Sequence, residues 1–323
     1  MMELAIEAIG LTKKFGGHGK GPFKKPIVEA LKNVDFKIKS GENYCLLGPN
    51  GSGKTTLIRC VLGLLESEGS VKLLGYNIPK QRNKVIQQIG YMPQETSLYS
   101  DLSVEETLQF FARMFGLKDR EYRNKAIETI LDVLKLKEWE NMVVENLSGG
   151  MKRRLSLACS LVHEPKLIIL DEPTVGVDPK LRLTFWDYFN DLNKDGATIL
   201  TTTHVMDEAE KSHIIGFMRD GRLIAEGSID ELKRKIPKYR KLTVKTAIEN
   251  TQSIGKLISK EYNLEVLPSQ FKIEVFYDDN SMLEPLLELI KRETTIREIL
   301  TTEPNLEDIF IHFSSKKEGS IDK

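Results

Sequence analysis

Residues 48–55 form a segment whose residue types and spacing suit the binding of phosphate. The segment reads Gly-Pro-Asn-Gly-Ser-Gly-Lys-Thr and fits the pattern G-x-x-x-x-G-K-[ST]. In this pattern backbone N–H groups surround the phosphates of a nucleotide, the Lys54 ammonium reaches the β and γ oxygens, and the Thr55 hydroxyl ligates Mg²⁺. The candidate nucleotide-binding residues here are Gly48, Pro49, Asn50, Gly51, Ser52, Gly53, Lys54, Thr55 and Thr56. Many nucleotide-binding proteins share the pattern, so other residues must decide among them.

A second candidate phosphate site lies further along the chain, just before a run with a helical pattern, Met151–Ala158. Residues that precede a helix offer free N–H groups and the positive end of the helix dipole to an anion. Lys54 already binds phosphates in its own loop. The second phosphate site is therefore predicted to contact ATP that is bound by another chain. We therefore expect a head-to-tail pair with a second ATP-binding subunit. The candidate residues of this site are Leu147, Ser148, Gly149 and Gly150.

Two consecutive carboxylates, Asp171 and Glu172, follow the apolar run Leu167–Leu170. A carboxylate at the end of a buried strand can meet Mg²⁺ at the edge of a sheet, which makes Asp171 a candidate metal ligand. Glu172 then points toward the γ-phosphate and is the candidate base that activates the attacking water. An Asp-Glu pair before a proline is by itself typical of a turn. The two phosphate-binding segments, in this order, favour the functional interpretation.

The order of these segments resembles the ATP-binding-cassette (ABC) family, over residues 4–228. The resemblance implies that Gln94 senses Mg²⁺ and the γ-phosphate, and that His204 is the switch histidine that bonds the γ-phosphate and orients the water. The alternatives are a solvated loop residue for Gln94 and a structural histidine for His204. The expected catalytic residues are thus Lys54, Gln94, Glu172 and His204. The expected Mg²⁺ ligands are Thr55, Gln94 and Asp171.

The same resemblance implies two more contacts with ATP. Asp178 matches the loop that crosses to the partner subunit, and it could also cap a helix that begins at Pro179. Phe15 matches the aromatic residue that stacks on adenine, and its alternative is a place in the core. The glycine-rich, basic insertion Gly16–Pro26 is longer than the loop usual there, which leaves the geometry of the adenine side open.

The elements that must position these residues follow an α/β pattern. Strands are predicted at residues 3–11, 28–39, 44–47, 167–170 and 198–202. A helix at 55–62 completes the strand, loop and helix context that the phosphate loop requires. A helical subdomain is expected at about 95–165, with a helical pattern from Ser103 to about Leu136, a capping box at Ser103 and Glu106 and a cap at Asp119. Asp220-Gly221 predicts a hairpin between strands at 214–218 and 222–225.

The expected fold class is α/β: a P-loop NTPase core of the ABC type with an inserted helical subdomain and an antiparallel β subdomain, plus a small C-terminal α+β domain. We expect the ATP-binding domain at 1–228, an accessory or dimerisation domain at 229–313, and a disordered tail at 314–323. In the second domain the pattern predicts strands at 242–246, 271–276 and 296–300, and helices at 253–261, 282–292 and 306–313.

The composition sets limits on function. The chain has 323 residues, 40% of them hydrophobic, with 47 basic and 47 acidic side chains. This balance gives no global field for nucleic acid, and no nucleic-acid partner is expected. Three cysteines in separate apolar contexts suit a reduced compartment. Neither a membrane-spanning run nor a secretory signal is visible, so a cytoplasmic protein, peripheral on the cytoplasmic face of the membrane, is expected.

The closing segment Thr302–Phe310 resembles the C-terminal signature of ATPase subunits of daunorubicin-exporter-like, ABC-2-type transporters. The resemblance implies an ATPase subunit that dimerises around two ATP-Mg²⁺ to drive export by a membrane-spanning permease subunit. The permease should dock near Gln94–Leu117, where Phe110 and Met114 either add exposed apolar surface or belong to the core. The alternatives are a soluble ABC ATPase acting on nucleic acid or ribosomes, an importer subunit and a non-enzymatic scaffold. Cargo, the choice between homodimer and heterodimer, and the role of the C-terminal domain stay open.

Overall fold

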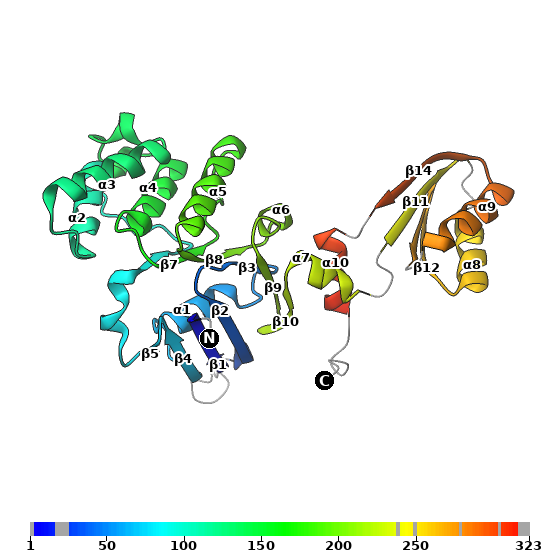
Figure 1. The fold of residues 1–323 in the computed structure, drawn as a ribbon, viewed down its shortest axis with the longest axis horizontal. Helices are drawn as coiled ribbons and strands as arrows, with labels where there is room; N and C mark the ends of the chain where they lie inside the picture. The colour runs from blue at the N-terminus through cyan, green and yellow to red at the C-terminus, as the bar shows by residue number, and fades with distance from the viewer. Residues whose placement is uncertain are drawn as a thin grey trace. The chain divides into compact units, whose positions relative to one another are not determined.

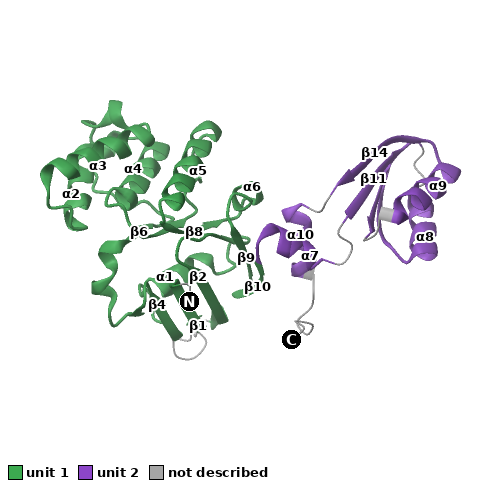
Figure 2. Ribbon diagram, in the orientation of Figure 1, with its two compact units in different colours: residues 1–226 green, residues 227–323 purple. Residues whose placement is uncertain are grey.

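The computed structural model describes residues 3–16, 26–236, 240–247, 251–277, 280–302 and 305–315. The chain divides into two compact units, residues 1–226 and residues 227–323 (Figure 2). Residues 17–25 of the predicted insertion and residues 316–323 of the expected tail lie outside the described residues. The last helix, α10 (Leu306–Ser315), continues two residues into that tail, so the expectation of disorder is wrong for Ser314 and Ser315.

The centre of unit 1 is a six-stranded sheet of order β10-β9-β3-β8-β7-β6 (Figure 1). Its strands are β3 (Asn43–Leu47), β6 (Ile89–Met92), β7 (Leu167–Asp171), β8 (Thr198–Thr203), β9 (Ile214–Arg219) and β10 (Arg222–Gly227). β3, β7 and β8 are buried at every residue, as expected of parallel strands covered on both faces. Because β8 pairs in parallel with both β3 and β7, the carboxyl ends of these three strands meet at one edge.

A second, antiparallel sheet of order β2-β1-β4-β5 completes the core of unit 1. Its strands are β1 (Leu4–Phe15), β2 (Val28–Lys39), β4 (Glu68–Leu73) and β5 (Tyr76–Ile78). Helix α1 (Lys54–Val61) follows the phosphate loop. One apolar cluster joins the antiparallel sheet to the central one through α1, with Ile6 of β1, Leu57 of α1 and Ile169 of β7 among its members.

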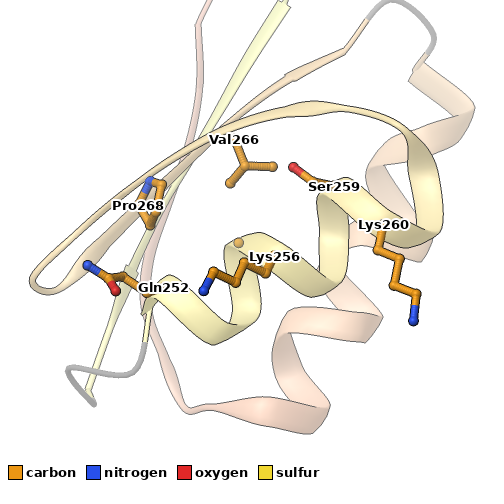
Figure 3. Close-up of a pocket in the computed structure, with 7 residues that line it drawn as sticks. Gln252, Lys256, Ser259, Lys260, Val266 and Pro268 are labelled. Atoms are coloured by element: carbon orange, nitrogen blue, oxygen red, sulfur yellow. The ribbon is translucent and has the colours of Figure 1, made fainter.

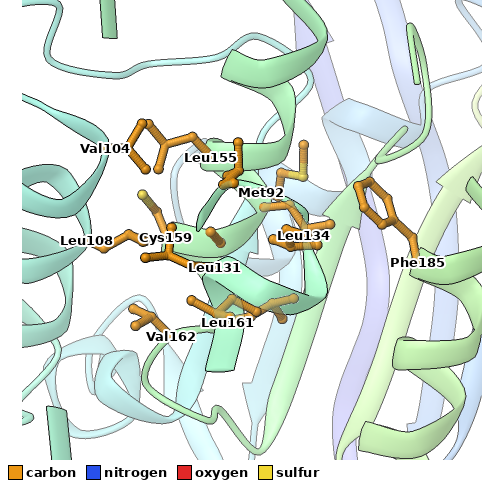
Figure 4. Packing of buried hydrophobic residues seen from close by; sticks show 14 of the residues in the cluster. Met92, Val104, Leu108, Leu131, Leu134, Leu155, Cys159, Leu161, Val162 and Phe185 are labelled. Carbon is orange, nitrogen blue, oxygen red and sulfur yellow. The ribbon is translucent and has the colours of Figure 1, made fainter. Parts of the chain in front are cut away.

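The helical segment of unit 1 contains α2 (Val104–Met114), α3 (Arg120–Val133) and α4 (Gly149–Leu161). Ser103 and Glu106 form the predicted capping box of α2, and the Asp119 carboxylate accepts the N–H of Tyr122 to cap α3. Apolar side chains of the three helices converge on one core, which also takes in Phe185 of the later helix α5 (Pro179–Lys194) (Figure 4). Among the helices of the described ranges, none is long and apolar enough to cross a bilayer.

Unit 2 has its own sheet and its own core. It begins with α7 (Ile229–Arg234), and its sheet has the order β12-β13-β11-β14. The strands are β11 (Arg240–Thr246), β12 (Glu265–Ser269), β13 (Lys272–Tyr277) and β14 (Ile296–Thr302). Helices α8 (Thr251–Tyr262) and α9 (Leu283–Glu293) contribute Ile258 and Ile290 to the apolar cluster that contains Val244 and Val275 of the sheet. The strand β12 is absent from the sequence prediction.

Candidate nucleotide-binding and catalytic site

The phosphate loop joins β3 to α1 and is packed too closely for a side chain at two of its glycines. A Cβ on Gly48 would lie 2.1 Å from the carbonyl oxygen of Met218, and a Cβ on Gly53 would lie 2.6 Å from that of Ala30. Gly53 also has a φ of 108° and is the N-cap of α1, a backbone conformation that residues with a Cβ rarely adopt. Packing and backbone conformation therefore require both glycines of the sequence pattern.

A hollow of about 190 Å³ opens at this loop. Apart from Ala30, every residue that lines it is a predicted site residue. Those residues are Asn50, Gly51, Ser52, Gly53, Lys54, Thr55, Thr56, Gln94 and Glu172. The structure thus brings the loop together with one residue that follows β6 and one that follows β7, although the three segments are far apart in the sequence.

Lys54 is 5% exposed and points back into its own loop. Its Nζ donates to the carbonyl oxygen of Gly48 at 2.7 Å and to that of Pro49 at 3.1 Å, and it lies 3.9 Å from Oε1 of Glu172. Burial lowers the pKa of the Lys54 ammonium, and the nearby negative charges of Glu172 and Asp171 oppose that shift. A buried cation held by carbonyl dipoles at the floor of the hollow is well placed to attract phosphate oxygens.

Asp171 ends β7 and has one satisfied and one free carboxylate oxygen. Its Oδ1 accepts a hydrogen bond from the Thr202 hydroxyl at 2.5 Å, whereas Oδ2 is buried and has no hydrogen-bond partner among the described residues. A buried oxygen of this kind fits a hard cation such as Mg²⁺. No group of three His, Cys, Asp or Glu side chains that could hold a metal occurs in the described part of the chain. Thr55 and Gln94 are the other predicted protein ligands of a cation here.

Glu172 lies close to residues from three other segments of the chain. Its carboxylate accepts a hydrogen bond from Nε2 of Gln94 at 3.3 Å, lies 3.4 Å from Nδ1 of His204, and is the group that faces Lys54. The residue is 7% exposed, and its backbone has a φ of 53°. The Glu172 N–H donates to the hydroxyl of Thr202 at 3.0 Å. A buried carboxylate beside a histidine, an amide and an ammonium can hold a water for attack on a phosphate.

Arg153 of α4 contributes to the site, although it is not among the residues predicted from the sequence. Its Nη1 donates to the carbonyl oxygens of Pro93, at 3.2 Å, and Gln94. Its Nη2 donates to those of Asp171, at 2.9 Å, and Glu172, at 2.5 Å. Burial lowers the pKa of the guanidinium. One side chain of α4 thus holds the backbone at both Gln94 and Glu172, which line the hollow.

The second predicted phosphate site is not part of the hollow at the phosphate loop. The Ser148 hydroxyl accepts the N–H of Met151 at 3.3 Å and caps α4, which begins at Gly149 as the sequence predicts. None of residues 147–150 lines the hollow at the phosphate loop. Ser148 and Gly149 are exposed, so the free N–H groups at this helix N-terminus are open to an anion from outside the chain.

Asp178 and Phe15 are also exposed and lie outside the lining of the hollow. The Asp178 carboxylate accepts the N–H of Leu181 at 3.0 Å and caps α5, with Pro179 in the first turn. Phe15 is 41% exposed at the end of β1 and does not belong to the core, and the Lys13 ammonium lies 5.2 Å from its ring centroid. Phe15 is therefore a surface residue with a cation over one face of its ring.

A wider hollow, of about 480 Å³, lies in unit 2 between α8 and β12 (Figure 3). It is lined by Gln252, Gly255, Lys256, Ser259, Lys260, Val266 and Pro268. None of these lining residues is acidic, so the lining offers no carboxylate ligand for a metal. The phosphate-loop hollow is smaller, but predicted catalytic side chains line it.

The parallel sheet, the glycine loop between β3 and α1 and the carboxylate pair at the end of β7 define a P-loop nucleotide hydrolase. A profile of the family described as "ABC transporter" matches residues 31–175. The chain is 33% identical over 317 residues to the linearmycin resistance ATP-binding protein LnrL of Bacillus subtilis (strain 168), covering 96% of this chain and 98% of that protein. The chain belongs to the ABC transporter family, as an ATP-binding subunit with an ATPase cassette.

Other similar proteins share the cassette. The probable multidrug ABC transporter ATP-binding protein YbhF of Escherichia coli (strain K12) is 43% identical over 232 residues, which cover 72% of this chain and 38% of YbhF. The chain thus matches well under half the length of that relative. A solved structure described as an ATP binding subunit of an ABC transporter has a TM-score of 0.64 and 28% identity, covering 72% of this chain and 92% of that one.

A second solved structure is a post-hydrolysis state of the ATP-binding cassette MJ0796, described as dimeric and bound to ADP and Pi. It has a TM-score of 0.63 and 27% identity, covering 69% of this chain and 98% of that one. These matches confirm the predicted family, fold class and ATPase character. The individual site residues stay predictions.

Proposed function

We propose that this chain is the ATP-hydrolysing subunit of an ABC exporter and works as a dimer on the cytoplasmic face of a membrane. The observation that carries the proposal is the carboxylate of Glu172, which is buried and lies within 3.4 Å of both Gln94 and His204. Lys54, which lines the hollow at the phosphate loop, lies 3.9 Å from the same carboxylate. This arrangement suits a water held between a base and the terminal phosphate of ATP.

In the proposed reaction Lys54 binds the β and γ oxygens and offsets their charge. Glu172 accepts a proton from the attacking water, while His204 and Gln94 orient that water and contact the γ-phosphate. Thr55, Asp171 and Gln94 would hold Mg²⁺, which supplies positive charge to the β and γ oxygens. The free Oδ2 of Asp171 is the feature that favours this ligand set.

We infer a head-to-tail dimer from the separation of the two phosphate sites. Residues 147–150 do not line the hollow of their own chain, and Ser148 is exposed at the N-terminus of α4. In the dimer this helix N-terminus faces the ATP bound by the second subunit, and the loop that ends in Asp178 lies at the same interface. The dimeric description of the MJ0796 cassette supports this arrangement.

The membrane-spanning partner is proposed to dock on α2. A groove of about 690 Å³ there is lined by Leu102, Glu105, Glu106, Gln109, Phe110, Arg113 and Met114. Phe110 and Met114 are 42% and 51% exposed, so of the two sequence alternatives the surface one holds for both. Tyr99 lies beside Phe110 with ring centroids 5.3 Å apart and is 52% exposed. Such an apolar strip with charged borders suits an amphipathic segment of the permease.

Export is favoured over import by the names of similar proteins. LnrL is described as a resistance protein and YbhF as a probable multidrug transporter protein, and a further relative from Rhizobium meliloti, 39% identical, is a Nod factor export protein. The cargo of this chain depends on its membrane partner.

Replacement of Glu172 by glutamine tests the proposal. Glu172→Gln keeps the size of the side chain and removes the base, so ATP hydrolysis should fall about 100-fold or more while ATP still binds. With ATP and Mg²⁺ the variant should accumulate as a dimer in size-exclusion chromatography, and an exposed change such as Glu210→Gln serves as control. Near-normal turnover by Glu172→Gln would contradict the proposed role.

A further inference from the structure

Glu208 is a buried carboxylate to which the proposed reaction gives no role. It lies in the short helix α6 (Met206–Ala209) and is 3% exposed. Its Oε1 accepts a hydrogen bond from the Thr174 hydroxyl at 2.5 Å, and its Oε2 accepts one from the Thr203 hydroxyl at 2.7 Å. Nη1 of Arg182 lies 3.5 Å from Oε1. Two hydroxyl donors and a guanidinium suit an ionised carboxylate, which can only accept hydrogen bonds.

One of these contacts controls the backbone at the switch histidine. Thr203 directly precedes His204, and its hydroxyl also accepts the N–H of Val205 at 3.0 Å. The hydroxyl that Glu208 holds therefore bridges the backbone on both sides of His204. The imidazole is 42% exposed and lies 3.4 Å from the Glu172 carboxylate, so its position depends on the backbone that carries it as well as on that contact.

The other contacts control the loop that ends in Asp178. Thr174 is 2% exposed, and its carbonyl oxygen accepts the N–H of Val177 at 3.1 Å. Arg182 donates from Nη2 to the carbonyl oxygen of Val177 at 3.4 Å. The loop is thus held at Thr174 and at Val177, and both attachments lead to the carboxylate of Glu208.

We propose that Glu208 is a positioning residue that couples the loop ending in Asp178 to the loop that carries His204. The inference rests on the proposed head-to-tail dimer, in which the Asp178 loop faces the second subunit. A displacement of that loop by the partner moves Thr174 and Val177, and the shared carboxylate transmits it through Thr203 to the imidazole. Hydrolysis in one site then depends on the state of the opposite subunit through one buried side chain.

Glu208→Gln is the first test, because it keeps the size of the side chain and replaces one acceptor oxygen by an NH₂ donor. The full chain is assayed for kcat, for the KM for ATP, for ATP affinity and for thermal unfolding. We expect kcat to fall about tenfold with the KM within about twofold of wild type. Glu210→Gln, an exposed glutamate next to the same helix, is the matched control and should behave like wild type.

A double-mutant cycle separates coupling from a merely structural role. Asp178→Ala should slow turnover about tenfold in the wild-type chain, but less than about twofold in the Glu208→Gln background, because the connection is already broken. If the two losses multiply instead, Glu208 does not couple the loops. Should Glu208→Gln fail to fold, Thr203→Val and Thr174→Val each remove one hydroxyl, and the same non-additive pattern is expected for both.

The same assay separates failure of this inference from failure of the proposed function. If wild type shows no turnover, or Glu172→Gln keeps near-normal turnover, the ATPase mechanism is wrong. If wild type is active and Glu172→Gln is inactive, but Glu208→Gln matches Glu210→Gln in kcat, only the coupling role of Glu208 is overturned.

Discussion

A single threonine hydroxyl holds the carboxylate of Asp171 and the backbone of Glu172 at the end of β7. Oγ1 of Thr202 donates to Oδ1 of Asp171 and accepts the N–H of Glu172. The first bond leaves Oδ2 of Asp171 free, and the second helps to hold Glu172 at a φ of 53°. A left-handed conformation costs a residue with a Cβ about 1 kcal/mol or more, so the neighbouring strand must stabilise it. The sequence predicted the strand at Thr202 but not this role, because threonine is common in buried strands for its shape alone.

The buried side chain of His163 makes the stability of the protein depend on pH. It is 8% exposed, stacks on Phe115 with ring centroids 4.0 Å apart, and its Nε2 lies 3.1 Å from the carbonyl oxygen of Ile89. Burial lowers the pKa of His163 from 6.5 to about 4. Between pH 6.5 and pH 4 the unfolded chain binds a proton at His163 that the folded chain excludes. The contribution of His163 to the free energy of unfolding is therefore complete above about pH 6.5 and is lost as the pH falls toward 4.

We therefore predict that the free energy of unfolding falls by about 2 kcal/mol more between pH 7 and pH 5 in wild type than in His163→Gln, which has no such proton to exclude. Urea unfolding of both proteins at the two pH values measures this difference. Equal falls in the two proteins would show that His163 does not carry the effect.

At the scale of elements, the sequence predicted what depends on local chemistry and missed what depends on distant backbone. The capping side chains of Ser103, Asp119 and Asp178 bind backbone groups only a few residues away, so the sequence spacing predicts them. Arg153 binds backbone carbonyl oxygens of residues more than fifteen positions away. Every residue has such a carbonyl group, so the sequence does not show which of them Arg153 will bind. The strand β12 was missed because it contains Pro268 and lies exposed at the edge of its sheet.

The helix α4 is predicted to support catalysis through Arg153. Arg153→Met removes four guanidinium–carbonyl contacts around the hollow, and we expect it to lower the free energy of unfolding by about 2–4 kcal/mol and also to slow ATP turnover. Arg123→Met is the matched control, because Arg123 is equally buried and binds the carbonyl oxygens of Leu117 and Lys118 within the helical segment. Denaturant unfolding and ATPase assays compare the two variants. Equal losses of turnover would mean that Arg153 acts only through stability.

At the scale of the whole molecule, two phosphate sites on one chain predict a dimer. In this dimer each chain completes the ATP site of the other. Ser148→Arg places a bulky cation at the exposed N-terminus of α4 and should lower ATP hydrolysis about 100-fold, while ATP binding by the monomer stays nearly intact. Ser148→Ala loses the same helix cap without the bulk and should keep much more activity. Activity that is linear in protein concentration and insensitive to Ser148→Arg would contradict the head-to-tail arrangement.

Unit 1 is proposed to bind ATP, and unit 2 is proposed to stabilise the dimer. Every predicted site residue belongs to unit 1, which has its own apolar cores, whereas unit 2 closes its own core around residues such as Val244 and Ile290. A chain truncated after Gly227 keeps β10 whole. We expect its ATP affinity as a monomer to stay within about twofold of the full chain and its dimer to be weaker, because a second surface of association is lost.

Isothermal titration of ATP and sedimentation of the Glu172→Gln dimer, each with and without unit 2, measure the two effects. Val244→Asp in the full chain is the matched control: a charge in the core of unit 2 should unfold that unit at unchanged chain length, and it should weaken the dimer as truncation does. If truncation and Val244→Asp both leave the dimer intact, unit 2 does not assemble the subunits. A large loss of monomeric ATP affinity in a truncated chain that still folds would mean instead that unit 2 helps to bind the nucleotide.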